Sequence, residues 1–370
     1  MDYIRSLLAI PAFVLALVLA FVLHTLIHRQ SPRPRPLDSS PFTLPPSEII
    51  QQIASFLPPS AAATFASTCR CIRFAAGTQY LSALRASPTE NLELLELLLA
   101  DAPNDPIANV PSQFLCIHCA RLVPIYIGCG VSATPACRKA WDLSRRYIVS
   151  SFSPPFFYTI MAMHRHGHQC DELLARITPP TTTTYFSNTG ISSQHSVRYH
   201  IANAGSLLIR TQVTYIFPYP RVDGRTYSLG SFCRHIEGRT ENFSTAMELV
   251  QTEALSGVGR SQPNFIDCKY CQTTVLVGAR KLRGRGIGLF ITWWKDLGDG
   301  RAGDETWANQ LRPAEPTQPE KRKQGRHFDM PVVEEFEGHN ARYLDFDELS
   351  SRADRKELLR LCPYIAQAEK

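Results

Sequence analysis

The residues of this sequence best suited to chemistry are two pairs of closely spaced cysteines. Cys116 and Cys119 are separated by two residues, and so are Cys268 and Cys271. This spacing lets both sulfurs of a pair bind one metal ion at about 2.3 Å, and two pairs can complete the tetrahedral coordination of a structural zinc ion. The sequence therefore predicts a zinc site made of these four cysteines, which would stabilise the fold and take no part in catalysis.

The ligand set stays open at this point, because other residues are also suited to bind the metal. Cys233 and His235 are separated by a single residue and are alternative ligands, while Cys129 and Cys137 follow the first pair in the sequence. The two C-x-x-C pairs are about 150 residues apart, far more than in compact zinc motifs. The same cysteines could therefore be buried thiols, or only one of the pairs could bind an ion.

No motif in the sequence indicates catalysis. His164 and His168 in HRHGHQC would share one helix face, but Gly167 lies between them and no glutamate accompanies the pair, so we interpret this stretch as the end of a helix. GRGIG at residues 284–288 lacks the spacing of a dinucleotide-binding loop, and the sequence has no Walker A, G-x-S-x-G or paired-carboxylate motif. We therefore expect a protein that is not an enzyme.

The composition is that of a globular chain with two or three domains. Of its 370 residues, 44% are hydrophobic and 19% are charged, which is too apolar for a disordered protein. The formal net charge of +6 comes largely from local basic runs, so no nucleic-acid partner is expected. The odd number of 11 cysteines, with two C-x-x-C pairs among them, favours metal chemistry in a reducing compartment over a disulfide framework.

An uncharged apolar run over residues 7–27 is long enough for a membrane-spanning helix. At about 1.5 Å per residue it would cross a hydrocarbon core of about 30 Å. A cleaved signal peptide would have a shorter apolar region and a small-residue cleavage site, so residues 1–28 are predicted to be a transmembrane anchor. Arg29, Arg33 and Arg35 follow the run, and positive charge marks the cytosolic side. The sequence thus predicts a single-pass membrane protein with a cytosolic body, in a membrane that it does not specify.

A proline- and arginine-rich linker at residues 29–43 leads to a group of short predicted helices. The stretch LPPSEIIQQIASFLPPS at residues 44–60 has its apolar residues on one helical face and is bounded by Pro-Pro pairs. Two further short helices follow and end near Gly77. Three such helices in about 35 residues bury too little apolar surface to be stable alone, so we expect them to pack on a partner or on a neighbouring domain.

The segment LPPSEIIQQIASFLPPSAAATFASTCRCIRFAAG resembles an F-box, which would span residues 44–85. It has a Leu-Pro start, a glutamate before two aliphatic residues, an Ile-x-x-Phe-Leu-Pro helix end and a Cys-Arg near the close of the next helix, although Leu-Pro lies one residue further from Glu48 than is usual. The resemblance implies binding to the Skp adaptor of an SCF ubiquitin ligase. The residues that it implies as partly adaptor contacts and partly the seam between the helices are Pro45, Ile49, Ile50, Ile53, Leu57 and Phe65. Alternatively, all six form the core of a small helical subdomain.

Residues 90–350 are predicted to form a mixed α+β domain with an antiparallel sheet. Segments at residues 196–217 and 273–294 are rich in β-branched and aromatic residues and are interrupted by glycine turns, as in strands, whereas residues 156–167 have the pattern of a helix. The order of LCIHCARL, IMAMHRHG, SFCRHIEG, CKYCQT and ITWWKDLGDG resembles the C-terminal region of F-box-like proteins of filamentous fungi. That resemblance implies no mechanism. A basic stretch at residues 319–327 is predicted to be a flexible loop.

Two functions follow as hypotheses. In the first, the chain is an α+β protein with a transmembrane helix and a three-helix F-box. It acts as a membrane-tethered substrate receptor of an SCF-type ligase, with the Skp adaptor and the cullin complex as partners. Its mixed domain would hold a protein substrate, which the sequence does not identify, near the ubiquitin-conjugating enzyme. In the second, the chain is a non-enzymatic binding module for lipid headgroups or nucleic acid that is stabilised by zinc.

Overall fold

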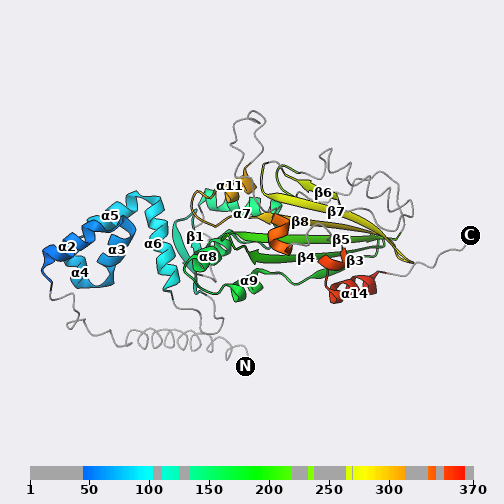
Figure 1. Ribbon diagram of the computed structural model, residues 1–370, viewed down its shortest axis with the longest axis horizontal. Coiled ribbons are helices and arrows are strands. Elements are labelled where there is room, and N and C mark those ends of the chain that lie inside the picture. Colours follow the sequence, from blue (N-terminus) through cyan, green and yellow to red (C-terminus); the bar gives the residue numbers. More distant parts are fainter. Residues whose placement is uncertain are drawn as a thin grey trace, which may run out of the picture. The chain divides into compact units, whose positions relative to one another are not determined.

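The computed structural model describes residues 45–102, 111–124, 134–218, 232–236, 264–268, 270–312, 332–338 and 346–362. These residues form two compact units, unit 1 ending at Ala86 and unit 2 beginning at Ser87 (Figure 1). The described part of unit 1 consists of helices. Unit 2 combines helices with a six-stranded antiparallel sheet, so the fold is of the mixed α+β class.

The part of the chain that the structure describes contains no membrane-spanning helix. Among the described residues, no helix is long and apolar enough to cross a bilayer. The longest helices described, α6 (Pro88–Ala100) and α7 (Pro135–Tyr147), have 13 residues each and extend about 20 Å of the roughly 30 Å required. The predictions of a transmembrane helix and of a single-pass membrane location are therefore wrong for the residues that the structure describes. The predicted anchor at residues 1–28, the linker at residues 29–43 and the basic loop at residues 319–327 lie outside the described residues.

Unit 1 is a bundle of short helices with a core of mostly small side chains. The three short helices predicted from the sequence are confirmed, and a fourth follows them: α2 (Ser47–Phe56), α3 (Pro59–Thr68), α4 (Arg70–Ala76) and α5 (Gln79–Ala86). The buried core residues are Ile50, Ala54, Ala66, Ile72 and Ala76. Small side chains let the helices approach closely, and the Gln51 side chain donates a hydrogen bond of 2.9 Å to the backbone oxygen of Ala75, which ties α2 to α4.

The sheet of unit 2 has the strand order β3-β4-β5-β8-β7-β6, and all neighbouring strands are antiparallel. The two predicted strand segments are confirmed as the hairpins β4–β5 and β7–β8, whose turns contain Gly205 and Gly284 with positive φ. The strands are β3 (Thr182–Phe186), β4 (Ile191–Ile201), β5 (Leu207–Phe217), β6 (Asn264–Asp267), β7 (Thr273–Leu282) and β8 (Gly286–Asp296). A separate hairpin joins β1 (Gln113–Cys116) to β2 (Arg121–Pro124).

Both faces of the sheet are covered, and alternate residues of the central strands pack against different layers. On one face, Leu207 and Ile209 of β5 pack into a core with residues of α6, α8 (Pro154–Arg165), α9 (Asp171–Ile177) and α11 (Glu305–Leu311). On the other face, Leu208 and Trp294 pack against α12 (Val332–Glu337) and α13 (Phe346–Leu349). Further along that face, Ile216 contacts Leu358 of α14 (Arg352–Leu361). The predicted helix at residues 156–167 is confirmed as α8.

A buried ion pair attaches the C-terminal helices to the centre of the sheet. Arg210 of β5 donates to both carboxylate oxygens of Glu337 in α12, at 2.8 and 3.1 Å. The indole nitrogen of Trp294, directly opposite Arg210 in the register, donates to the same carboxylate at 2.9 Å. Arg210 also donates to the backbone oxygen of Leu349 at 3.3 Å. One buried guanidinium therefore joins β5 to two helices that follow the sheet in the sequence.

Replacing Arg210 with methionine should destabilise unit 2 by about 3 kcal/mol, because it leaves the largely buried carboxylate of Glu337 without its cation. The free energy of unfolding, measured by urea denaturation, checks this value. Arg360→Met is the matched control: Arg360 forms an exposed pair with Glu357 at 2.8 Å, and exposed pairs contribute little. Equal losses of stability in the two variants would contradict the role given to Arg210.

Candidate functional site

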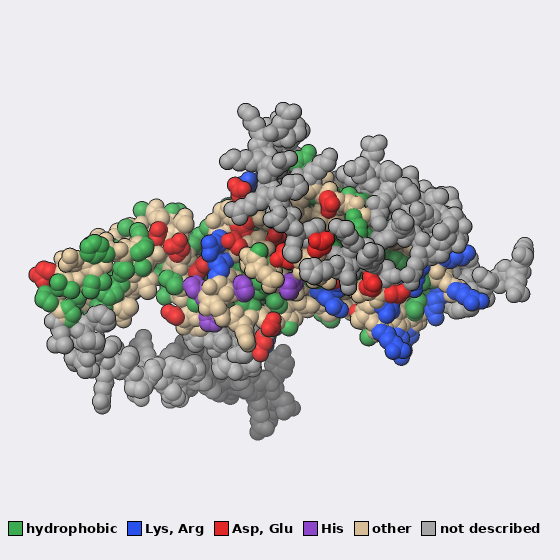
Figure 2. All heavy atoms as spheres, in the orientation of Figure 1, with side chains coloured by type: hydrophobic (Ala, Val, Ile, Leu, Met, Phe, Trp, Pro, Cys, Tyr) green, Lys and Arg blue, Asp and Glu red, His purple; other side chains and the backbone are tan. Residues whose placement is uncertain are grey.

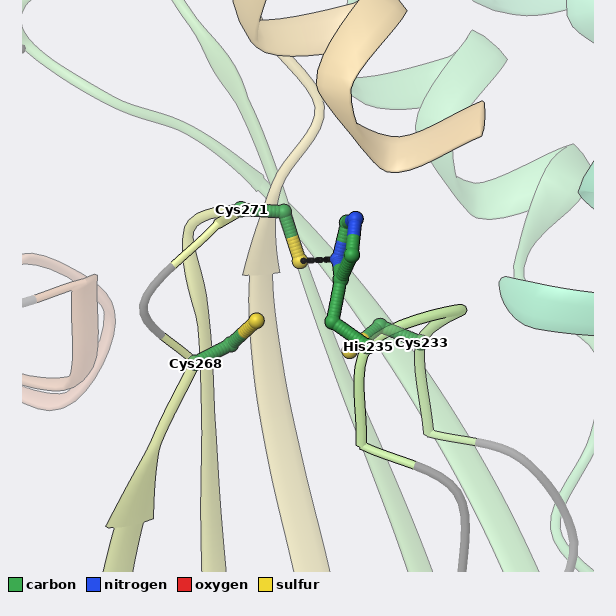
Figure 3. A group of neighbouring side chains, drawn as sticks. All are labelled: Cys233, His235, Cys268 and Cys271. Atoms are coloured by element: carbon green, nitrogen blue, oxygen red, sulfur yellow. Dashed lines mark hydrogen bonds between the residues drawn. The ribbon is translucent and has the colours of Figure 1, made fainter. Parts of the chain in front are cut away.

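Four potential metal ligands come together beside the β6–β7 hairpin of unit 2. The Sγ atoms of Cys233, Cys268 and Cys271 and a ring nitrogen of His235 all lie within 4.8 Å of one another. Figure 3 shows the side chains of Cys268 and Cys271 pointing from the hairpin towards those of Cys233 and His235. The four residues are called the metal centre below, since three thiols and an imidazole can hold a metal ion.

Backbone hydrogen bonds position the three cysteines of the metal centre. The Cys268 backbone nitrogen donates to the oxygen of Thr273 at 2.9 Å, which closes the turn that holds Cys271. Within this turn, the Tyr270 nitrogen donates to the Cys268 sulfur at 3.4 Å, and the Ile236 nitrogen likewise donates to the Cys233 sulfur at 3.1 Å. Backbone N–H groups directed at sulfur stabilise the thiolate form that binds metals.

Apolar residues of the sheet form the floor under the metal centre. Val275 and Val277 of β7 and Leu289 and Ile291 of β8 are buried beneath it. On the opposite segment, the ring of Phe232 packs edge-on against Trp293 of β8, with ring centroids 5.2 Å apart. This packing holds the segment at residues 232–236 against the sheet, with its two ligands beside those of the hairpin.

The three sulfurs share their protons unequally. Hydrogen bonds with Cys268 and Cys271 hold the pKa of Cys233 well below its usual range, and the bond to Cys233 raises the pKa of Cys268 to about 11. The hydrogen bond with Cys233 also raises the pKa of Cys271. A bound cation would displace the protons that the three coupled sulfurs hold.

His235 completes the donor set. Its Nδ1 atom lies 3.3 Å from the sulfur of Cys271, and its ring packs 5.2 Å from that of Tyr270. Its Nε2 atom is buried without a hydrogen-bond partner among the described residues. Because Nδ1 is the ring nitrogen that faces the sulfurs, it is the one placed to bind an ion, with the proton of the neutral imidazole on Nε2.

A buried lysine lies close to the metal centre. Lys295 is opposite Thr273 in the β7–β8 register, and the hydroxyl of Thr273 is 3.2 Å from the sulfur of Cys271. The Lys295 ammonium donates to the backbone oxygen of Tyr147. Burial lowers the pKa of Lys295, whereas the nearby thiolates of the metal centre raise it. Three thiolates, a neutral imidazole and a divalent ion carry one net negative charge, which this ammonium would balance.

The structure separates the four cysteines that the sequence grouped into one zinc site. Cys268 and Cys271 lie with the alternative ligands Cys233 and His235. Cys116 and Cys119 lie instead with Cys137, which the sequence indicated only as a further possible ligand. Cys116, Cys119 and Cys137 are called the three-cysteine cluster below. Cys129 lies outside the described residues.

The histidine-rich stretch is the end of a helix, as predicted. Helix α8 ends at Arg165, and Gly167 follows with a φ of +80°, the usual conformation after a helix C-terminus. Neither His164 nor His168 belongs to a group of potential metal ligands among the described residues.

The six residues implied as adaptor contacts have different environments in unit 1. Ile49 and Ile53 are 45% and 42% exposed, whereas Ile50 is 2% exposed and belongs to the core. Pro45, Leu57 and Phe65 are partly buried. The implied set omitted two aromatic residues that are highly exposed, Phe56 at 80% and Phe74 at 88%. Figure 2 shows hydrophobic side chains gathered on the surface of this unit.

Comparisons with known proteins add no family to these observations. No protein-family model matches the chain, and no curated protein or solved structure matches it either.

Replacing Lys295 with methionine should weaken metal binding although no ligand is removed. The affinity at pH 7 should fall about tenfold, which corresponds to about 1.4 kcal/mol, because the negatively charged centre loses its nearby cation. Since metal competes with protons for the thiolates, the pH at which half of the metal is released should rise. Acid titration with a chromogenic metal indicator measures that midpoint.

Lys281→Met serves as the control for this prediction, because Lys281 is an exposed lysine of β7. The metal-release curve of Lys295→Met could instead coincide with those of the unchanged chain and the control. That result would show that the buried ammonium does not act on the metal centre.

Proposed function

We propose that this protein is the substrate-receptor subunit of an SCF-type ubiquitin ligase and binds the Skp adaptor through helices α2 to α4. The observation that supports it best is a stripe of exposed apolar residues on α2. Ile49, Ile53 and Phe56 follow one another at intervals of four and three residues, so they lie on one face of the helix. Because this segment resembles an F-box, the partner proposed for that face is the Skp adaptor.

The contrast between the core and the surface of unit 1 supports docking over internal packing. The core is built from two isoleucines and three alanines, while larger apolar side chains of α2 and α4 face solvent. A small unit that leaves several large apolar side chains exposed while alanines fill much of its core presents a surface suited to a partner. An amphipathic helix that packs its apolar face into a groove of its partner is a common mode of recognition.

In this proposal, unit 2 presents a protein target and takes no part in the chemistry of ubiquitin transfer. Its contribution is proximity, because a tethered substrate meets the charged conjugating enzyme at a raised effective concentration. We also propose that the ion of the metal centre is zinc, since three thiolates and one imidazole in a buried, four-ligand arrangement are typical of structural zinc. Such a site has no open position for catalysis.

Adaptor binding is tested by co-purification of the full-length chain with a Skp adaptor. The unchanged chain should retain the adaptor, and the double variant Ile53→Asp, Phe56→Asp should lose it, because charge on the α2 stripe cannot be buried in an apolar contact. Both side chains are exposed in the free chain, so the variant should keep its helical circular dichroism.

Phe186→Asp is the matched control for adaptor binding. Phe186 is a similarly exposed apolar residue, but it lies on β3 in unit 2, so its replacement should leave the adaptor bound. The proposal is wrong if the unchanged chain does not retain the adaptor, or if the α2 double variant retains it as well as the control does.

Loss of zinc from the metal centre should destabilise unit 2 and spare adaptor binding. Cys271→Ser should lose one equivalent of zinc and about 4 kcal/mol of stability, while adaptor co-purification continues because unit 1 has its own core. Cys170→Ser is the control, since Cys170 is a buried thiol outside the potential metal groups. Zinc content by mass spectrometry and thermal denaturation provide the readouts, and equal zinc content in the two variants would contradict this assignment.

A further inference from the structure

The three-cysteine cluster has the sulfur spacing of a metal site. The Sγ atoms of Cys116, Cys119 and Cys137 lie within 4.8 Å of one another, and those of Cys116 and Cys137 are 3.6 Å apart. Two thiolates that bind one ion at about 2.3 Å in tetrahedral geometry are about 3.8 Å apart. The observed separation therefore matches the one that a shared ion requires.

The β1–β2 hairpin supplies two of the three sulfurs through a tight turn. Cys116 ends β1 opposite Arg121 of β2, so the intervening turn folds Cys119 back towards Cys116. Ala120 in this turn has a φ of +47°, and no other non-glycine residue of the described chain has a positive φ. That conformation costs about 1 to 2 kcal/mol, and strain of this kind is concentrated at binding sites.

Thr134 connects the hairpin turn to the helix that supplies the third sulfur. Its hydroxyl donates to the backbone oxygen of His118 at 3.4 Å and accepts from the backbone nitrogen of Cys137 at 3.2 Å. Cys137 thus lies in the first turn of α7, which has 13 residues, and the dipole of a helix favours a thiolate at its N-terminus. Two separate elements are held with their cysteines side by side.

The surroundings of the cluster suit a thiophilic ion. Cys116 and Cys137 are buried, Cys119 is half-buried, and Val123 and Trp141 pack around them. The imidazole of His118 is not part of the cluster, and its Nε2 atom shares a hydrogen bond of 3.0 Å with the hydroxyl of Tyr158. Sulfur ligands without carboxylates select ions such as Zn²⁺ or Cu⁺ over Mg²⁺ and Ca²⁺.

We propose that Cys116, Cys119 and Cys137 bind a second metal ion of the thiophilic class, independently of the metal centre. The three sulfurs leave the fourth position of a tetrahedral ion to another donor such as water. The ion would fasten the β1–β2 hairpin to α7, where the apolar core around the cysteines is small. This site does not depend on adaptor binding, so the failure of either proposal leaves the other standing.

Zinc stoichiometry of the full-length chain is the first test. After loading with zinc and removal of the excess, the chain should hold two equivalents, and Cys119→Ser and Cys271→Ser should hold one equivalent each. The double variant should hold none, and Cys170→Ser should hold two. A chain that holds a single equivalent, lost in Cys271→Ser and kept in Cys119→Ser, would overturn the proposal.

Alkylation of individual cysteines in the unchanged chain gives a second test that needs no variant. Cys119 and Cys268 are both partly exposed, so iodoacetamide reaches them unless an ion holds their sulfurs. In the zinc-loaded chain both should be protected, and a chelator should expose both, as peptide mass spectrometry would show. Buried Cys170 reports unfolding, because it stays unreactive while the fold persists.

In Cys271→Ser, Cys268 should react with iodoacetamide while Cys119 stays protected by its own ion. The proposal is overturned if Cys119 reacts at the same rate in the zinc-loaded and the chelator-treated chain. It is also overturned if Cys119 loses its protection in Cys271→Ser while Cys170 stays unreactive, since the two sites would then not be independent.

Discussion

The antiparallel pair β5–β8 at the centre of the sheet is the interaction on which the rest of unit 2 depends. Because both faces of this pair are covered, a large polar side chain buried on it is costly without a partner within the protein. Arg210 finds Glu337, and Gln212 donates to the hydroxyl of Ser350 at 3.2 Å. These polar side chains of β5 therefore bind the C-terminal helices to the sheet.

The same requirement shapes the metal centre on the opposite face. The apolar residues of β7 and β8 form its floor, and Lys295 at the end of β8 is buried beside it. A buried ammonium is costly, but here it donates to the backbone oxygen of Tyr147, and the negative charge of the nearby thiolates stabilises it. A bound ion with three thiolates would need such a cation, so the lysine and the centre are best explained together.

The sequence indicated the elements of the sheet but not which distant segments meet. The strands around residues 196–217 and 273–294 were predictable because β-branched residues and glycine turns are local signals. Likewise, C-x-x-C spacing identified ligands within one turn, but only the sheet topology decides that Cys268 meets Cys233 and not Cys116. In unit 1, Ile49 and Ile50 are adjacent, and their pattern alone could not show that the second is core and the first is exposed. The apolar stripe on α2 did contain Phe56, a signal that could have added it to the contact set.

Adaptor binding by unit 1 is the central functional claim, and isothermal titration calorimetry of the purified full-length chain with a Skp adaptor measures it most directly. We expect saturable one-to-one binding with a negative heat-capacity change, because binding would remove the exposed residues Ile49, Ile53 and Phe56 from water. Heats that do not saturate at adaptor concentrations of about 100 µM would mean a free energy of binding weaker than roughly −5 kcal/mol. That result would contradict a dedicated docking surface on α2.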